Sequence, residues 1–230
     1  MSDAPLFTPL EALRADLERR FRTTTRVVQL GGADVDLLSP ANADELISED
    51  DYVMDERLPY WADLWPSAQI LAEEVRTMRL ADERVLELGC GMGLVAVAAA
   101  MAGGAVTATD YYEDAVRFAR LNVAEATGRE IDTRMVDWSR MPADLGRFGV
   151  VLASDVLYEP RYAAMVAGAI AGTLARGGTA IVADPGRIAL PAFREECAAL
   201  GLETAGDVRP YAEGEIRQTI TLWRVRWKAD

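Results

Sequence analysis

The sequence predicts a doubly wound α/β domain, in which a mostly parallel sheet carries helices on both faces and an N-terminal cap precedes it. Three observations predict this fold. From residue 84 onward short apolar segments alternate with longer helical ones, glycines stand where the helices should end, and a glycine-rich loop directly follows the first apolar segment. Such alternation is typical of parallel strands joined by helices that cover both faces of the sheet.

The alternating region contains five expected strands, because five short apolar runs are separated by helical segments. They cover residues 85–88, 106–109, 133–136, 150–153 and 180–183. The expected helices cover residues 94–102, 113–125, 161–175 and 191–200. Glycines such as the pair Gly177-Gly178 stand where these helices should end. Apolar and polar positions alternate over residues 217–227, which predicts a final strand near an edge of the sheet.

The first 80 residues are less regular and predict the elements of a cap. We expect a helix over residues 10–21, a β-hairpin over residues 26–38 around Gly31-Gly32, and a second helix over residues 67–78. A chain of 230 residues fits one domain of ordinary size. We therefore expect residues 1–80 to pack as cap elements on a core of residues 81–230.

The composition excludes several classes of function. The chain has 37 acidic and 24 basic residues, a net charge of −13 and a single lysine, Lys228. So acidic a protein lacks a general electrostatic attraction to nucleic acid or to anionic membranes. The absence of histidine excludes the usual serine–histidine and cysteine–histidine nucleophiles, and two cysteines are too few for a four-thiolate zinc site. We expect no metal, no nucleic-acid partner and no membrane association.

The two cysteines, Cys90 and Cys197, are widely spaced and predict reduced thiols. The first residues lack the basic flank and apolar segment of a signal peptide, and the longest apolar stretch, residues 94–108, is too short to cross a bilayer. We therefore expect a soluble, cytoplasmic protein. We also expect it to be a monomer.

The glycine-rich loop, residues 89–93 (GCGMG), follows the first expected strand and begins a helix, as a nucleotide-binding loop does. Its spacing departs from the dinucleotide pattern, because the third glycine comes one residue early and Leu94 stands in its place. Glu87 precedes the first glycine by two residues. A carboxylate there repels a diphosphate but suits a ligand that carries an ammonium or a sulfonium cation.

The ligand that fits this loop is S-adenosylmethionine. Asp110 ends the second expected strand, 21 residues after the first glycine, where an acidic residue accepts hydrogen bonds from ribose hydroxyls. The third strand is followed by a carboxylate that can accept the adenine amino group. The residues expected to bind the cofactor are Glu87, Gly89, Cys90, Gly91, Asp110, Tyr111, Asp137 and Trp138. The alternative is a tight glycine turn with capping acids, and Cys90 itself is expected to be a small buried filler rather than a reactive thiol.

The chemistry is expected at the end of the fourth strand, because open α/β sheets bind ligands at the carboxyl ends of their strands. Ser154, Asp155 and Tyr158 follow that strand. Methyl transfer needs an aligned and unprotonated nucleophile, and an amine with a pKa of about 10 needs desolvation or a proton acceptor to lose its proton. We expect Asp155 and Tyr158 to hold an acceptor nitrogen. The alternative is that Asp155 caps the following helix and Tyr158 packs in the core.

Two segments resemble the motifs of a known family. Residues 153–158 (ASDVLY) resemble the Asp-x-x-Tyr motif of the seven-β-strand protein lysine methyltransferases, and residues 60–66 (YWADLWP) resemble their Trp-Pro segment. Within that family, residues 60–66 and residues 184–187 (DPGR) are most similar to the branch that methylates the β-subunit of the electron-transfer flavoprotein and to its bacterial relatives. The resemblance covers roughly residues 25–187.

The resemblance implies a Rossmann-like sheet of seven strands whose last strand is antiparallel. It implies that Asp155 and Tyr158 face the substrate nitrogen. The residues that it implies for the cofactor site are Trp65, Gly89, Gly91, Asp110, Trp138 and Ser154. An Asn-Pro-Pro-Tyr-like motif is missing, which argues against adenine and glutamine-amide substrates.

The sequence therefore predicts an S-adenosylmethionine-dependent N-methyltransferase that modifies a lysine side chain of a protein and releases S-adenosylhomocysteine. Two alternatives remain open, a small-molecule N-methyltransferase for a nicotinamide-like amine and a non-catalytic S-adenosylmethionine-binding protein. The acidic stretch Asp44–Glu56 is either a solvated surface or steers a cationic substrate. Arg187 either stabilises its turn or contacts an acidic substrate surface, and Trp65 is either a wall of the cofactor pocket or part of the core.

Overall fold

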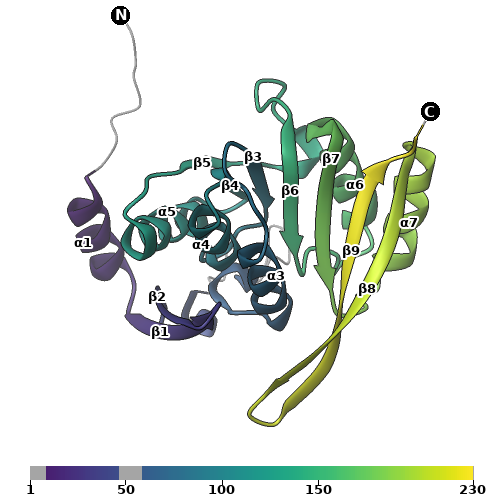
Figure 1. The fold of residues 1–230 in the computed structure, drawn as a ribbon. Coiled ribbons are helices and arrows are strands. Elements are labelled where there is room, and N and C mark those ends of the chain that lie inside the picture. The colour runs from purple at the N-terminus through teal and green to yellow at the C-terminus, as the bar shows by residue number, and fades with distance from the viewer. Residues whose placement is uncertain (1–8, 47–58, 230) are drawn as a thin grey trace, which may run out of the picture.

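A seven-stranded sheet crosses the molecule in this computed structural model, which describes residues 9–46 and 59–229. Its strands lie side by side in the order β5 (Asp132–Met135), β4 (Ala105–Asp110), β3 (Arg84–Leu88), β6 (Phe148–Ser154), β7 (Leu174–Asp184), β9 (Ile216–Trp227) and β8 (Leu202–Glu213) (Figure 1). The strands β3 to β7 are parallel, and β9 is antiparallel to both of its neighbours. The seven strands and the antiparallel last strand confirm the predicted fold.

Helices cover both faces of the sheet (Figure 1). One face carries α3 (Pro66–Arg76), α4 (Leu94–Met101) and α5 (Glu113–Thr127), and the other carries α6 (Tyr162–Thr173) and α7 (Leu190–Ala199). Successive residues of a strand point to opposite faces, so Val85 packs with the first group and Leu86 with the second. None of the helices in the described residues combines the length and the hydropathy needed to cross a membrane.

The boundary between α6 and β7 differs from the prediction. The expected helix continues to residue 175, but Leu174 already belongs to β7 and pairs with Phe148 of β6. The expected helix stop, Gly177-Gly178, lies inside β7. A Cβ at Gly178 would come within 2.7 Å of the carbonyl oxygen of Gly149, so this glycine permits the close approach of β6 and β7.

The edge strand β8 has no counterpart among the expected strands. Within it only Leu202 and Tyr211 are buried, so the sequence lacks the apolar alternation by which a strand is recognised. It forms by pairing with β9 along its whole length. As a result β8 forms the edge of the sheet, and β9, which the sequence predicts near an edge, is the second strand from that edge.

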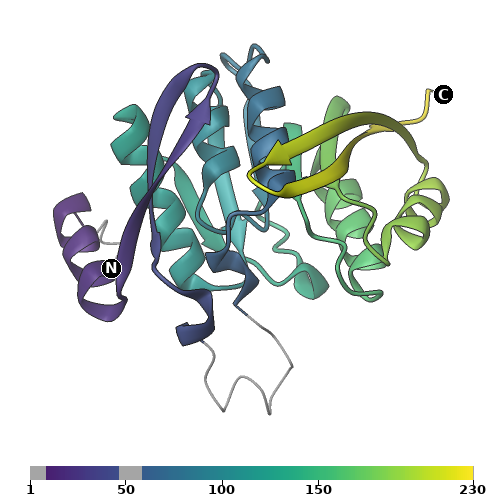
Figure 2. The ribbon, with the colours of Figure 1, turned by 90° about the horizontal axis from the view of Figure 1, so that it is seen from below.

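The β8–β9 hairpin extends beyond the rest of the sheet (Figure 1 and Figure 2), and residues on both of its strands contact α3. Gln69 of α3 donates a hydrogen bond to the Tyr211 hydroxyl at 2.8 Å. Arg209 and Arg224 both form ion pairs with Glu74 of α3. These contacts fix α3, whose first turn lies beside the pocket described below.

The N-terminal elements pack against α5. They are α1 (Leu10–Arg20) and a separate two-stranded antiparallel sheet of β1 (Thr23–Leu30) and β2 (Ala33–Pro40), which confirms the predicted hairpin. Asn122 of α5 accepts a hydrogen bond from the Leu38 N–H at 2.8 Å and donates to the carbonyl groups of Leu38 and Met92 at 2.9 Å. This buried amide therefore joins the cap to the glycine loop.

Candidate active site

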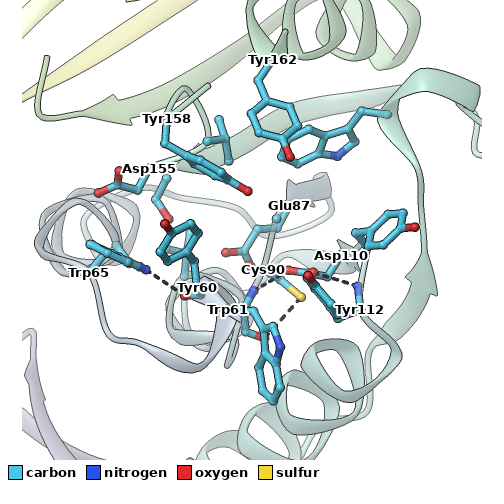
Figure 3. Close-up of a pocket in the computed structure, with 18 of the residues that line it drawn as sticks. Tyr60, Trp61, Trp65, Glu87, Cys90, Asp110, Tyr112, Asp155, Tyr158 and Tyr162 are labelled. Atoms are coloured by element: carbon cyan, nitrogen blue, oxygen red, sulfur yellow. Dashed lines mark hydrogen bonds between the residues drawn. The ribbon is translucent and has the colours of Figure 1, made fainter. Parts of the chain in front are cut away.

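A pocket lies at the carboxyl ends of β3, β4, β5 and β6, where open α/β sheets bind ligands (Figure 3). All the residues predicted to bind the cofactor or to act in catalysis line it, from Trp65 through the glycine loop and Asp110 to Asp155 and Tyr158. The structure thus brings together side chains from four strand ends and from the segment before α3. Their individual roles stay predictions.

The glycine loop turns from β3 into α4 through left-handed backbone conformations that favour glycine. The φ angles of Gly91 and Gly93 are 49° and 87°. A Cβ at Gly91 would lie 3.0 Å from the carbonyl oxygen of Trp61, so η2 (Tyr60–Ala62) packs directly on the loop. A Cβ at Gly93 would lie 2.7 Å from the Cα of Ala119, so α4 begins in close contact with α5.

Gly93→Ala is expected to lower the free energy of unfolding by about 2–4 kcal/mol, because left-handed strain adds to overpacking against α5. Gly128→Ala is a matched control. Gly128 also has a positive φ, 68°, but a Cβ there would meet no atom within 4 Å, so we expect a loss of about 1 kcal/mol. Urea unfolding measures both variants, and equal losses would contradict the packing role of Gly93.

Asp110 ends β4 and holds the glycine loop in place. Its Oδ2 accepts a hydrogen bond from the Gly91 N–H at 2.9 Å, and its Oδ1 accepts one from the Tyr112 N–H at 3.1 Å. Burial raises the pKa of this carboxyl group, and the backbone hydrogen bonds oppose that rise. A carboxylate has about four lone-pair sites, more than these backbone donors use, so Asp110 can still accept a hydrogen bond from a ligand hydroxyl. The neighbouring Tyr111 is exposed.

Two buried polar atoms in the pocket, Glu87 Oε2 and Trp138 Nε1, have no hydrogen-bond partner among the described residues. Glu87 is 1% exposed, and burial, together with the charge of Asp110, raises its pKa well above the usual value. Burial therefore favours the protonated form of Glu87, and an approaching cation favours the ionised form. Because buried polar groups nearly always have partners, a ligand that brings a cation to Glu87 and a hydrogen-bond acceptor to Trp138 would satisfy both atoms. S-adenosylmethionine offers both, so the pocket fits this cofactor.

Local surroundings explain two other predicted cofactor residues, Asp137 and Cys90. Asp137 precedes η3 (Trp138–Arg140) and caps it, because its Oδ1 accepts a hydrogen bond from the Ser139 N–H at 2.8 Å. Cys90 is buried, and burial raises the pKa of its thiol well above the usual range. The thiol is therefore protonated and unreactive, in keeping with the expected filler role.

Asp155 follows β6 in a left-handed conformation, with a φ of 57°, that aspartate and asparagine adopt more readily than most residues. Its side chain is buried. Oδ1 accepts a hydrogen bond from Arg187 Nε at 2.6 Å, and Oδ2 accepts one from Ser67 Oγ at 3.0 Å. The alternative that Asp155 caps the next helix is wrong, because α6 begins after Arg161 and no side-chain hydrogen bond from the N-cap is present.

Aromatic side chains form the wall of the pocket beside Asp155 (Figure 3). The ring centre of Tyr158 lies 5.3 Å from that of Tyr60 and 4.9 Å from that of Tyr162, and Tyr162 lies 5.6 Å from Trp138. Burial and a hydrogen bond with Tyr162 raise the pKa of Tyr158, so its phenol stays protonated. Trp65 donates a hydrogen bond to the Tyr60 carbonyl at 2.9 Å and lines the pocket.

Three side chains at the site, Ser67, Tyr112 and Tyr162, were not singled out from the sequence. Ser67 directly follows the Trp-Pro segment and Tyr112 follows Tyr111, so their place next to a motif was the available signal. Tyr162 begins α6 and no motif marks it. Most of the acidic stretch Asp44–Glu56, which is predicted to face solvent or to steer a substrate, falls in residues 47–58, outside the described residues.

Comparison with family models identifies the family of this chain. The chain matches a family described as lysine methyltransferase over residues 60–183, more than half of its length. It is 30% identical to protein N-lysine methyltransferase METTL21A of Xenopus tropicalis over 101 aligned residues. These residues cover 41% of this chain and 46% of that protein. It is 29% identical to the electron transfer flavoprotein beta subunit lysine methyltransferase of Xenopus laevis over 133 aligned residues. These residues cover 56% of this chain and 53% of that protein.

A shorter match, 41% identical over 81 residues, covers 35% of this chain and 34% of the ubiquinone biosynthesis O-methyltransferase of Azotobacter vinelandii. The chain thus matches about a third to a half of the length of these curated relatives.

Solved structures share the fold. Magnesium protoporphyrin IX methyltransferase from Synechocystis, with bound S-adenosylmethionine, aligns with a TM-score of 0.58 and 21% identity over 81% of this chain and 98% of that chain. An identity this low shows the fold alone. The family match, in contrast, includes the aromatic segment before α3, the glycine loop, Asp155 and Tyr158. This chain therefore belongs to the lysine methyltransferase family and has the fold of S-adenosylmethionine-dependent methyltransferases.

Proposed function

We propose that this protein is an S-adenosylmethionine-dependent N-methyltransferase that acts on a lysine side chain of a protein. One observation carries the proposal. Asp155 and Tyr158, the Asp-x-x-Tyr pair of the family, lie beside a pocket whose unpartnered buried atoms fit the cofactor. Both relatives with a lysine methyltransferase name support a protein acceptor.

The proposed cofactor contacts follow from the chemistry of the lining. Asp110 would hold the ribose hydroxyls, Glu87 would balance the positive charge, and Asp137 would accept the adenine amino group. The ring of Trp138 and the backbone of the glycine loop would enclose the nucleoside. Trp65 and Ser154 would complete the wall toward the acceptor.

When bound, S-adenosylmethionine supplies a methyl group on a sulfonium sulfur: the amine lone pair forms the N–C bond, the S–C electron pair stays on sulfur, and S-adenosylhomocysteine remains. The residues of the chain must align the amine and receive it without its extra proton. Asp155 can accept a hydrogen bond from an amine N–H, and the protonated Tyr158 can accept another at its phenol oxygen. The proton that the amine loses passes to solvent.

A lysine side chain suits this site, because its apolar stem can lie along aromatic rings while its polar end reaches the carboxylate. The net charge of −13 favours the approach of a basic protein surface. We also propose that the protein acts as a monomer in the cytoplasm, where the free thiols of Cys90 and Cys197 remain reduced.

The test is transfer of a radioactive methyl group from S-adenosylmethionine into a lysate of cells that lack the protein, followed by mass spectrometry of the modified sites. We expect labelled protein bands and new methyl-lysine residues. The variant Lys228→Arg serves in a parallel reaction, because Lys228 is the single lysine of the chain and its removal excludes self-labelling on lysine.

Two outcomes would contradict the proposal. Label in extractable metabolites and not in proteins would favour a small-molecule N-methyltransferase. Binding of the cofactor without label in any fraction would favour a non-catalytic binding protein.

A further inference from the structure

Arg187 contacts the carboxylate that the proposed function places at the acceptor amine. Its Nε donates to Oδ1 of Asp155 at 2.6 Å, and its guanidinium carbon lies 5.3 Å from the ring centre of Trp65. The side chain of Asp155 is 6% exposed and that of Arg187 is 34% exposed. Because a guanidinium group keeps its charge at every physiological pH, a permanent cation stands beside this carboxylate.

The backbone of Arg187 is fixed by Asp184 at the end of β7. Oδ1 of Asp184 accepts hydrogen bonds from the N–H groups of Gly186 and Arg187 at 2.7 and 2.8 Å. Asp184 is completely buried, and Gly186 turns the chain with a φ of 96°. On the other side, Ser67 of α3 holds the second oxygen of Asp155. The fold therefore holds Arg187 and Asp155 together from three elements.

The charge of Arg187 matters because methyl transfer needs a neutral amine. A buried carboxylate without a partner stabilises the ammonium form of a neighbouring lysine and raises the pKa of that lysine above its usual value of about 10.4. A carboxylate that is already neutralised by a guanidinium group stabilises the ammonium form much less. Its oxygens nevertheless keep lone pairs that accept an N–H hydrogen bond.

Other titratable and charged groups surround this pair. They are Asp184 in β7, Tyr60 in η2, Tyr158, Glu159 and Arg161 before α6, and the acids Glu87 and Asp110 on the cofactor side. Glu159 and Arg161 pair with each other at 2.7 Å, and Tyr158 keeps its proton. Burial raises the pKa of Asp184, the backbone hydrogen bonds from Gly186 and Arg187 oppose that rise, and this carboxyl group also attracts Arg187. Arg187 is therefore the cation that balances Asp155 directly.

We propose that Arg187 is a positioning residue: by neutralising Asp155 it prevents this carboxylate from stabilising the ammonium form of the acceptor amine, and so it sets the pH range of methyl transfer. This inference rests on the proposed function. The amine gives its proton to solvent before transfer, and the N–C bond then forms as the S–C bond breaks. The chain contains no histidine, so no imidazole of the enzyme contributes to the pH profile.

The test compares kcat against pH for wild type, Arg187→Gln and Arg187→Lys. The substrate is a synthetic peptide around the lysine methylated in the lysate, at saturating S-adenosylmethionine. For Arg187→Gln we expect kcat at neutral pH to fall tenfold or more, the rising limb to move up by about one pH unit or more, and kcat to recover toward wild type at alkaline pH. Arg187→Lys restores the charge and should keep the limb near its wild-type position.

A matched control is Arg134→Gln, which removes another arginine that forms one ion pair, with Asp144 at 2.9 Å on the surface. Its profile should equal that of wild type.

A binding measurement separates this role from a structural one. Calorimetry with S-adenosylhomocysteine present compares the lysine peptide with the same peptide carrying norleucine, which has no charge. Arg187→Gln should bind the lysine peptide about threefold or more tightly than wild type does at neutral pH, because Asp155 then lacks its own cation. The norleucine peptide should bind both proteins equally.

A uniform fall in kcat at all pH values, or weaker binding of both peptides, would overturn the role of Arg187 and leave the proposed function intact. The absence of any methylated lysine with the wild-type protein would overturn the proposed function and this inference with it.

Discussion

Asp155→Asn is expected to lower kcat for methyl transfer by about 10²–10³-fold, while the Kd for S-adenosylmethionine changes by less than about threefold. Asparagine is the appropriate replacement because it tolerates the φ of 57° at this position and can still accept the hydrogen bond from Ser67. The amide cannot neutralise Arg187, so an uncompensated cation would face the acceptor amine. The single amide oxygen of asparagine must also accept the hydrogen bonds that two carboxylate oxygens accept in the wild type.

Single-turnover transfer with pre-bound cofactor measures the chemical step, and calorimetry measures the cofactor affinity. Asp144→Asn is the control, since this carboxylate pairs with Arg134 on the surface and lines no part of the pocket. Near-normal turnover of Asp155→Asn would assign the residue a structural role. A parallel loss of cofactor affinity would mean that the substitution disturbs the end of β6 rather than the acceptor.

The central part of the fold can be predicted from the sequence because its strands are buried on both faces. The residues of β3 and β6 are therefore nearly continuous apolar runs that stand out locally. The side chains of β8 are mostly exposed, and its pairing with β9 depends on the finished hairpin, so no local pattern reveals it. The pair Gly177-Gly178 does not end a helix as predicted, because the close approach of Gly178 to β6 is a tertiary contact that the local sequence does not show.

The candidate site likewise has parts that local sequence motifs reveal and parts that depend on tertiary contacts. The glycine loop, Asp110 and the Asp155–Tyr158 pair lie in short motifs, so the sequence shows them. The sequence does not show the contacts of Asp155, because Ser67 is 88 residues and Arg187 is 32 residues away along the chain. The charge of Glu87 is also a tertiary property. Its sequence position predicts an anion, but the packing around it favours the protonated form.

Glu87→Gln is expected to raise the thermal stability of the cofactor-free protein. Burial raises the pKa of Glu87 in the folded protein well above the value of 4.5 that applies to an exposed side chain. The folded state therefore holds a proton that the unfolded chain releases. The stability that this group contributes is fully present below about pH 4.5 and is lost as the pH rises toward the folded pKa. Glutamine undergoes no such loss, so the gain in Tm over wild type should increase as the pH rises above about 4.5.

The same substitution should weaken cofactor binding. A bound cation favours the ionised form of Glu87, so the wild type should release a proton on binding S-adenosylmethionine and bind it more tightly as the pH rises. Glu87→Gln should release fewer protons and bind about tenfold or more weakly, given about 1.5–3 kcal/mol for a hydrogen bond to a charged group. Calorimetry in buffers of different ionisation enthalpy measures both the proton release and the affinity.

S-adenosylhomocysteine, which lacks the sulfonium charge, shows where Glu87 acts. A loss of affinity confined to S-adenosylmethionine would assign the carboxylate to the sulfonium group, and equal losses for both ligands would assign it to the ammonium group that they share. Unchanged affinity for both, with unchanged proton release, would mean that Glu87 has no part in the choice of ligand. The preference of this glycine loop for a cationic nucleoside over a diphosphate would then need another cause.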